Sequence, residues 1–382
     1  MLTDFIYNLS ILVMILALIM VIMGVLLPIR YGRITIMVLF YSIIIAISIF
    51  AFFAEPGKSS DLAIFYESIS GIKYGYIVNQ GDEALIVWKI ILKIIALTDN
   101  YGYLPFLFII MWGILVGKIL NHYMLKNMYQ TKTIMLYFIA LFSGCSMYYM
   151  ISGIRNTFVC ALVFFGYYFY YQKKKSIYYF IVVVASLIHI FAIILFLLIE
   201  IFERMIKRNE NNKLVKLLIV VLVISLLIRT DIPFYIFETI PGGYGDLLEN
   251  KWQDYVVYSK ILSPEKMIQF IWMGYLLYFS IKNFITRSKV MLADWLIVIA
   301  FALSPMIIFF ERMIYFIGIA SLPIINEAYY KINKRYRYLY VCASFVVFAT
   351  YFLFTMYSMF AHIRFNGNDY HSFWKGLFFF VQ

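Results

Sequence analysis

The sequence has 382 residues, of which 64% are hydrophobic and 14% are charged, with a mean hydropathy of +0.87 and a net charge of +12. A soluble domain of this length has too little interior to bury so much apolar surface, so the composition excludes a soluble protein. We therefore predict an all-α, polytopic membrane protein that forms a single integral membrane domain over residues 1–382.

Apolar runs long enough to cross about 30 Å of hydrocarbon predict about 10 full membrane spans. The runs cover residues 5–27, 34–54, 103–120, 133–150, 156–171, 214–229, 265–281, 290–310, 313–330 and 337–358. The cysteines Cys145, Cys160 and Cys342 fall inside apolar runs and form no CxxC motif, which argues against a disulfide framework or a metal site. No metal and no cofactor are expected.

The apolar stretch at residues 176–202 is ambiguous, because basic clusters flank both of its ends. These clusters are Lys173–Lys175 before the stretch and Arg204, Lys207 and Arg208 after it. A single crossing would place one cluster outside, whereas a short bent hairpin keeps both clusters inside. We favour the hairpin, with its bend near His189, and a single span remains the alternative.

The distribution of charge along the chain predicts the topology. With both termini outside and the spans alternating, the inside loops hold 20 of the 32 basic residues and only 5 of the 20 acidic residues. Lys and Arg concentrate on the cytoplasmic side of membrane proteins, so this arrangement fits a multi-pass protein of the cytoplasmic membrane. The basic residues are spread over short loops, so nucleic acid is not an expected partner.

Two long segments are predicted on the outer side, residues 55–102 and 230–264, and they hold much of the polar material. Within the first, residues 84–97 are apolar except for Lys89 and Lys93, which are spaced i,i+4. This stretch is short for a span and charged on one side, which predicts an interfacial helix lying on the outer leaflet. The two lysines are expected to meet lipid phosphates.

The second outer segment combines acidic and aromatic residues near a "PGGYG" turn cluster. Asp246 and Asp254 lie close in sequence to Trp252, and a carboxylate beside an aromatic ring suits a sugar-binding surface. The alternative is a solvated loop with interfacial aromatic residues. Because 20% of the whole chain is aromatic, no single ring decides between the two.

Charged residues at the edges of apolar runs are candidates for a functional site, because such charges are costly unless a partner satisfies them. Arg155 opens the run "IRNTFVCALVFF", and Arg312 follows Glu311 between two apolar runs. Each has a structural explanation: Arg155 caps a helix or reaches the interface, Arg312 pairs with its neighbour, and His189 packs in the core. Arginine binds phosphate as a permanently charged fork, so two arginines on one side predict a site for the diphosphate of a lipid-linked donor.

Several of these stretches together resemble the EpsG family, a Wzy-like group of exopolysaccharide polymerases. An arginine that opens a span, a basic loop and a following histidine are similar to the family pattern in residues 152–200, and "ERMIYF" (311–316) is similar to its later arginine-led span. "SSDLAIFYESI" (59–69) and "DEALIVWKIIL" (82–92) are similar to its outer motifs. The sequence departs from the pattern in having Ser59 and Ser60 in place of Gly-Thr, and Glu55 and Lys58 where an arginine commonly stands.

The resemblance implies glycosyl transfer on the outer face of the bacterial cytoplasmic membrane. The growing glycan would leave its polyprenyl diphosphate and join a hydroxyl of the next lipid-linked repeat unit. Arg155 and Arg312 would stabilise the diphosphate, and His189 would act as a base or a hydrogen-bond partner. Glu311 and Asp61 are weaker candidates for the base. The candidate substrate-binding residues are Asp61, Tyr66, Glu83, Lys89, Lys93, Asp246, Trp252 and Asp254.

Two other functions stay open at this point. A flippase of the same lipid-linked oligosaccharide would also use paired arginines, although no internal repeat of the kind common in transporters is visible. A membrane acyltransferase would use the histidine of the predicted hairpin. The expected partners are the polyprenyl-diphosphate-linked oligosaccharide and membrane lipids, with a chain-length regulator and export proteins as further candidates.

Overall fold

The computed structural model describes residues 2–57, 60–75, 85–207, 216, 218–223, 264–285, 291–304 and 307–365. Almost all of these residues lie in helices, which confirms the all-α prediction. The described part also contains two short strands, β1 (Ala54–Pro56) and β2 (Ile363–Phe365), which pair antiparallel with Glu55 opposite Arg364. The chain divides into two compact units, residues 1–197 with 318–382 and residues 198–317.

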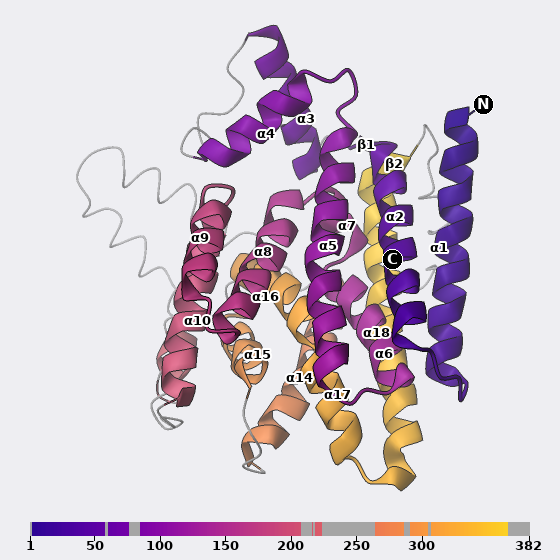
Figure 1. The fold of residues 1–382 in the computed structure, drawn as a ribbon, viewed down its shortest axis with the longest axis vertical. Coiled ribbons are helices and arrows are strands. Elements are labelled where there is room, and N and C mark those ends of the chain that lie inside the picture. Colours follow the sequence, from indigo (N-terminus) through magenta and orange to yellow (C-terminus); the bar gives the residue numbers. More distant parts are fainter. Residues whose placement is uncertain are drawn as a thin grey trace. The chain divides into compact units, whose positions relative to one another are not determined.

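The first unit is built on long apolar helices (Figure 1). In the described part of the chain, four helices are long and apolar enough to cross a membrane. They lie in α1 (Leu2–Leu26), α2 (Arg33–Phe52), α5 (Tyr103–Lys126) and α18 (Arg337–His362), the last preceded by the 3-10 turn η2 (Lys334–Tyr336). Figure 1 places the α1–α2, α5–α6 and α17–α18 connections at one end of this unit and β1, β2, α3 and α4 at the other.

Two glycines allow α2 and α5 to pack closely. Gly113 and Gly117 lie one turn apart on α5 and are buried. A Cβ atom on Gly113 would overlap Ile44 of α2, and one on Gly117 would lie 2.5 Å from the Tyr41 hydroxyl oxygen. Small residues at this spacing bring helix backbones together, which gains packing contacts that lipid tails cannot supply.

The prediction of about 10 full spans is not confirmed. Residues 133–150 divide into α6 (Thr131–Gly144) and α7 (Met147–Ile151), and residues 313–330 divide between α16 (Ile307–Ala320) and α17 (Leu322–Lys331). Every residue of α6 except Lys132 is buried. A short helix surrounded by protein needs apolar side chains on all sides, so its hydropathy resembles that of a span although it is too short to cross the membrane.

The ambiguous stretch at 176–202 contains two helices. Helix α8 (Ile154–Tyr171) is followed by α9 (Lys175–Ser186) and α10 (Phe191–Lys207). The rings of Tyr178 and Tyr179 on α9 lie 5.8 and 6.0 Å from that of Phe196 on α10. A continuous helix would separate these residues by about 27 Å at 1.5 Å per residue, so the chain folds back on itself here. The predicted break near His189 is confirmed.

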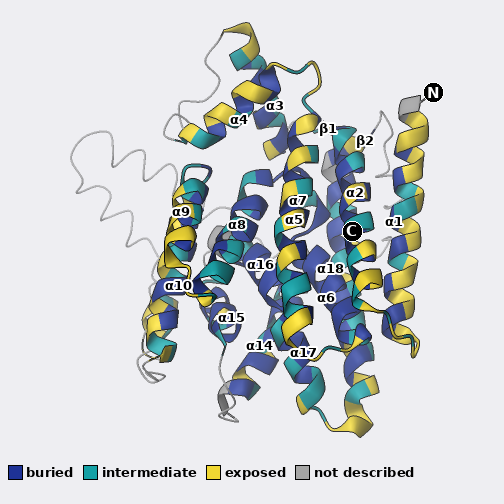
Figure 2. Cartoon of the chain, in the orientation of Figure 1, coloured by how far each residue is buried: buried dark blue, intermediate teal, exposed yellow. Residues whose placement is uncertain are grey.

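Two short helices, α3 (Asp61–Tyr74) and α4 (Ile86–Ala96), form a layer at the end of the first unit that carries the strands. Each has one buried and one exposed face (Figure 2). On α4 the buried side chains include Trp88 and Leu92, whereas Lys89 and Lys93 are exposed beside Ile86, Ile90 and Ile94. The predicted interfacial helix at 84–97 is therefore present as an amphipathic helix whose outer face combines apolar side chains with two lysines.

A hydrogen-bond network centred on Asn326 stabilises the end of this unit opposite α3 and α4. The Asn326 amide nitrogen donates to the Tyr123 hydroxyl (3.1 Å) and to the Met128 carbonyl (3.0 Å). Its side-chain oxygen accepts from the Thr133 hydroxyl at 2.9 Å. One side chain of α17 thus ties α5, α6 and the loop between them.

Replacing Asn326 with leucine should destabilise the protein by about 1–3 kcal/mol, because leucine has a similar size but leaves the buried polar partners unpaired. Thermal unfolding of the purified protein in detergent measures the effect. Asn121→Leu is a matched control, because Asn121 is half-buried on α5 outside this network. Equal melting temperatures for the two variants would contradict the role of the network.

The second unit contains α14 (Pro264–Ile285) and α15 (Leu292–Ala302), together with parts of α10 and α16. Asp294 is fully buried and bridges its two helices. One carboxylate oxygen accepts from the Met291 backbone N–H (2.9 Å), which caps α15, and the other accepts from the Asn283 amide of α14 (3.0 Å). Both bonds stabilise the buried charge, so this carboxylate has a structural role.

Candidate functional site

Arg155 lies in the first turn of α8, where its guanidinium lies beside two aromatic rings that contact each other. The guanidinium carbon is 5.0 Å from the centre of the Phe65 ring and 5.1 Å from the centre of the Trp88 ring. The two rings are 5.0 Å apart and inclined at 68°. These distances allow a cation–π interaction with each ring. We call Phe65, Trp88 and Arg155 the arginine clamp.

The clamp joins three helices. Phe65 comes from α3 and Trp88 from α4, and both side chains are buried, at 3% and 0% exposure. The Trp88 ring packs edge-on against Phe108 of α5 at 5.7 Å, and Phe108 packs against Phe158 of α8 at 4.8 Å. These contacts fix the rings, so the position of the arginine is set by its neighbours rather than by its own flexible stem.

Neither the charge nor the donors of Arg155 suit a cap at this position. A helix N-terminus carries a partial positive charge and has N–H groups that need acceptors, whereas a guanidinium is cationic and has only donors. These properties argue against the alternative of a helix cap. The N–H donors of a guanidinium lie in its plane, where carboxylates and phosphates bind, whereas aromatic rings contact its faces.

His189 lies in the bend between α9 and α10. The Nδ1 atom of its ring accepts a hydrogen bond from the backbone N–H of Phe191 at 3.0 Å. The neighbouring carbonyl of Leu187 accepts from the backbone N–H of Trp88 at 3.4 Å, which attaches the bend to α4. When Nδ1 of a neutral imidazole is an acceptor, Nε2 carries the proton. The geometry favours His189 as a hydrogen-bond donor over a base.

Replacing His189 with leucine should lower both the stability and the activity of the protein. The loss of the bond to the Phe191 N–H resembles the loss of a helix cap and should cost about 1 kcal/mol. Asparagine has a short side-chain acceptor, so His189→Asn should restore thermal stability without restoring activity, because it lacks the Nε2–H donor. Melting temperature and the length of surface polysaccharide measure the two effects. Full activity in the leucine variant would show that His189 is only a packing residue.

Asp61 and Tyr66 lie on α3, but they do not belong to the clamp. Asp61 is exposed in the first turn, where its charge interacts favourably with the helix N-terminus, and Ser60 caps the helix by accepting from the Ala63 N–H at 3.3 Å. The Tyr66 ring packs against that of Tyr101 at 5.6 Å. Burial raises the pKa of Tyr66, so its hydroxyl stays protonated.

The other predicted residues lie elsewhere. Lys89 and Lys93 are exposed on the outer face of α4. Glu311 and Arg312 are half-buried on α16, in the unit of residues 198–317. Glu83, Asp246, Trp252 and Asp254 are outside the described residues. Within the described ranges, no three His, Cys, Asp or Glu side chains are grouped so that they could hold a metal ion.

The clamp residues Phe65 and Trp88 were not predicted from the sequence. Phenylalanine, tyrosine and tryptophan make up a fifth of the chain, so the identity of a ring gives no signal. Their positions in the sequence gave a weak signal, because Phe65 precedes Tyr66 and Trp88 precedes Lys89. Tyr66 and Lys89 are candidate site residues.

The apolar helices, the amphipathic layer formed by α3 and α4, and the arginine that contacts a ring from each of these two helices are features of a multi-pass helical membrane protein. The EpsG family model matches residues 62–370, which is most of the chain, and the chain belongs to the EpsG family. The matched range includes Arg155, His189 and Arg312. Searches of curated proteins and of solved structures gave no match. Family membership makes this chain a polysaccharide polymerase-like membrane protein.

Proposed function

We propose that the protein polymerises lipid-linked polysaccharide repeat units by glycosyl transfer from a polyprenyl-diphosphate donor. The arginine clamp carries this proposal, because it offers a fixed, partly buried guanidinium in a chain of the EpsG family. Cation–π contacts involve the flat face of a guanidinium, whereas anionic groups such as phosphates bind along its edge.

The proposed reaction forms a bond between an acceptor hydroxyl oxygen and the anomeric carbon of the growing glycan. The bond from that carbon to the diphosphate oxygen breaks, and the acceptor proton passes to a base or to the departing diphosphate. Negative charge develops on the diphosphate as the bond breaks. Hydrogen-bond donors that are already held in position at a site of low dielectric stabilise such charge most effectively. Arg155 would supply that stabilisation.

The remaining site residues keep the roles that the sequence suggests. Arg312 is a second candidate for the diphosphate, Glu311 and Asp61 are candidate bases, and His189 is a candidate hydrogen-bond donor. Lys89 and Lys93 are candidates for contact with lipid headgroups, since they share an exposed face with apolar side chains. The candidate sugar contacts outside the described residues are Glu83, Asp246, Trp252 and Asp254.

We place the reaction on the outer face of the bacterial cytoplasmic membrane. The end of the first unit opposite the clamp carries the basic connections, including Arg30, Lys126 and Lys334. An excess of Lys and Arg in short connections is typical of the cytoplasmic side. The end with the strands, α3 and α4 then faces outward.

Lipid-linked glycans of cells that lack this chain test the proposal. Mass spectrometry should find single repeat units on the polyprenyl carrier, and leaflet-selective enzymatic labelling should find them on the outer leaflet. Restoring the chain should restore long polysaccharide. Single units retained on the inner leaflet would instead indicate a flippase and would overturn the proposed polymerase.

A further inference from the structure

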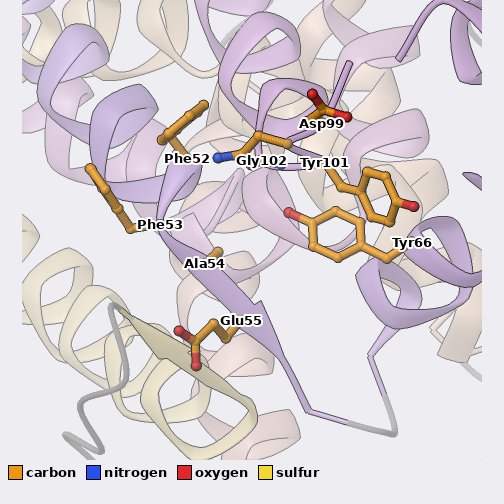
Figure 3. Close-up of a pocket in the computed structure, with 9 residues that line it drawn as sticks. Phe52, Phe53, Ala54, Glu55, Tyr66, Asp99, Tyr101 and Gly102 are labelled. Carbon is orange, nitrogen blue, oxygen red and sulfur yellow. Dashed lines mark hydrogen bonds between the residues drawn. The ribbon is translucent and has the colours of Figure 1, made fainter. Parts of the chain in front are cut away.

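A second candidate site lies at the same end of the first unit, between α3, the loop before α5 and strand β1 (Figure 3). It is an open pocket with a volume of about 340 Å³, within the range of small-molecule sites. Its lining comes from two chain segments and one side chain of α3. The lining residues are Phe52, Phe53, Ala54, Glu55, Tyr66, Asp99, Asn100, Tyr101 and Gly102.

The pocket wall is a fixed piece of backbone. The Asn100 side-chain oxygen accepts from the Gly102 N–H at 2.8 Å, and the Thr98 hydroxyl donates to the Asn100 carbonyl at 3.1 Å. A Cβ atom on Gly102 would overlap the Phe52 carbonyl oxygen, so only glycine fits where the loop passes the end of α2. The loop therefore holds its shape before any ligand arrives.

The chemistry of the lining suits a polyhydroxylated ligand. Aromatic rings of Tyr66 and Tyr101 offer apolar surface, and the carboxylates of Glu55 and Asp99 offer acceptors for hydroxyl groups. The Asn100 amide nitrogen adds a donor. Mixed aromatic surface and a few polar groups are what small-molecule sites commonly combine.

Each of the two carboxylates has a basic residue close to it. Lys73 lies 3.3 Å from Asp99, and Arg364 is directly opposite Glu55 in the strand pair. Opposite charges at facing positions of an antiparallel pair attract each other. A strongly cationic ligand would compete with Lys73 and Arg364 for the two carboxylates. The presence of these basic residues therefore favours an uncharged ligand.

The Tyr66 hydroxyl is a buried polar group with no hydrogen-bond partner within the described residues. Figure 3 shows the Tyr66 ring reaching from α3 toward the middle of the lining residues, with its hydroxyl end foremost. Buried hydroxyls are nearly always paired in folded proteins, so an unpaired one beside a pocket indicates where a ligand group belongs.

We propose that this pocket binds an uncharged sugar ring of the acceptor glycan. The inference rests on the proposed function, since a polymerase needs a site for the acceptor glycan as well as for the donor. Phe65 and Tyr66 are consecutive on α3 and so point about 100° apart. Phe65 contacts Arg155 and Tyr66 lines the pocket, so one helix links the acceptor pocket to the arginine clamp.

Binding of simple glycosides tests the proposal without requiring polymerisation. The full chain in lipid nanodiscs is titrated with methyl glucoside, methyl galactoside, methyl N-acetylglucosaminide and methyl glucuronide, and saturation-transfer NMR reports binding. At least one uncharged glycoside should bind. Tyr66→Phe and Glu55→Gln should each weaken it about tenfold, the equivalent of one good hydrogen bond. Tyr74→Phe is the matched control, because Tyr74 is 70% exposed on the same helix.

Two outcomes would overturn the proposal. One is the absence of binding by any uncharged glycoside, or binding that the Tyr66→Phe and Glu55→Gln variants leave unchanged. The other is preferential binding of the charged glucuronide. If polymerisation still depended on Arg155 in the same preparation, the pocket alone would be refuted and the proposed function would stand.

Discussion

Replacing Arg155 with alanine is expected to reduce polymerisation by about 10²–10³-fold while the protein still accumulates in the membrane. This is the usual effect of removing one donor that stabilises charge developing in a transition state. Lysine keeps the charge but loses the planar group that lies against Phe65 and Trp88, so Arg155→Lys should retain partial activity. Chain length of surface polysaccharide, normalised to the abundance of the protein, measures the effect.

The chain offers a second arginine that lies beside two aromatic rings as a control. The Arg337 guanidinium lies 5.0 Å from the Tyr329 ring and 5.9 Å from the Tyr330 ring, and it donates to the carbonyls of Ile332 and Tyr330. It lies at the start of α18, at the end of the unit opposite the clamp. Arg337→Ala should therefore affect stability more than polymerisation. Long chains at normal abundance in Arg155→Ala would show that this arginine only anchors α8.

The same assay tests whether Arg312 acts on the same chemical step. Groups that act together on one step have strongly non-additive effects. The double variant with alanine at positions 155 and 312 should therefore be scarcely less active than either single variant. Losses that multiply would show that the two arginines act independently.

Replacing Trp88 with alanine should reduce polymerisation by about 30-fold per folded molecule. A desolvated cation–π contact contributes about 2 kcal/mol, and each 1.36 kcal/mol changes a rate tenfold. Trp88 is a positioning residue in this interpretation, because it acts through Arg155. Phenylalanine keeps a ring over the guanidinium, so Trp88→Phe should recover most of the activity, whereas Trp88→Leu should not.

A matched control separates this effect from lost packing. Trp112 is also well buried, at 2% exposure, and its ring packs against that of Phe142. Removing a large buried side chain typically destabilises a protein by about 3–5 kcal/mol, so Trp112→Ala should lower the melting temperature comparably. It should leave the activity of the remaining folded protein unchanged. Equal activity in Trp88→Leu and Trp88→Phe would contradict the cation–π interpretation.

The sequence was sufficient for features that depend on local patterns. Composition predicted an all-helical membrane protein, the basic clusters around residues 176–202 predicted a break near His189, and the two lysines of "ALIVWKIILKIIAL" predicted the one-sided helix α4. Each of these depends on spacing along a single helix or on charge at its ends. Such signals survive in an apolar sequence because charged residues are rare in it.

Features that depend on contacts between distant segments of the chain could not be predicted from local sequence patterns. An apolar run has the same composition whether lipid or protein surrounds it, so α6 resembled a span although protein buries it. Phe65 and Trp88 meet Arg155 only after three helices separated along the chain have packed together. The pocket of Glu55 and Asp99 likewise depends on a loop that passes the end of α2.

The pairing of β1 with β2 has a consequence for the order of assembly. Residues 54–56 are made early in synthesis, but their partners at 363–365 follow the last long helix. Contacts between residues so far apart form late, because the intervening chain must first be placed. A nascent chain would therefore insert Arg155 well before the strand that carries Glu55 gained its partner. Pairing of Glu55 with Arg364 would then be among the last contacts to form in the first unit, after its long helices are in place.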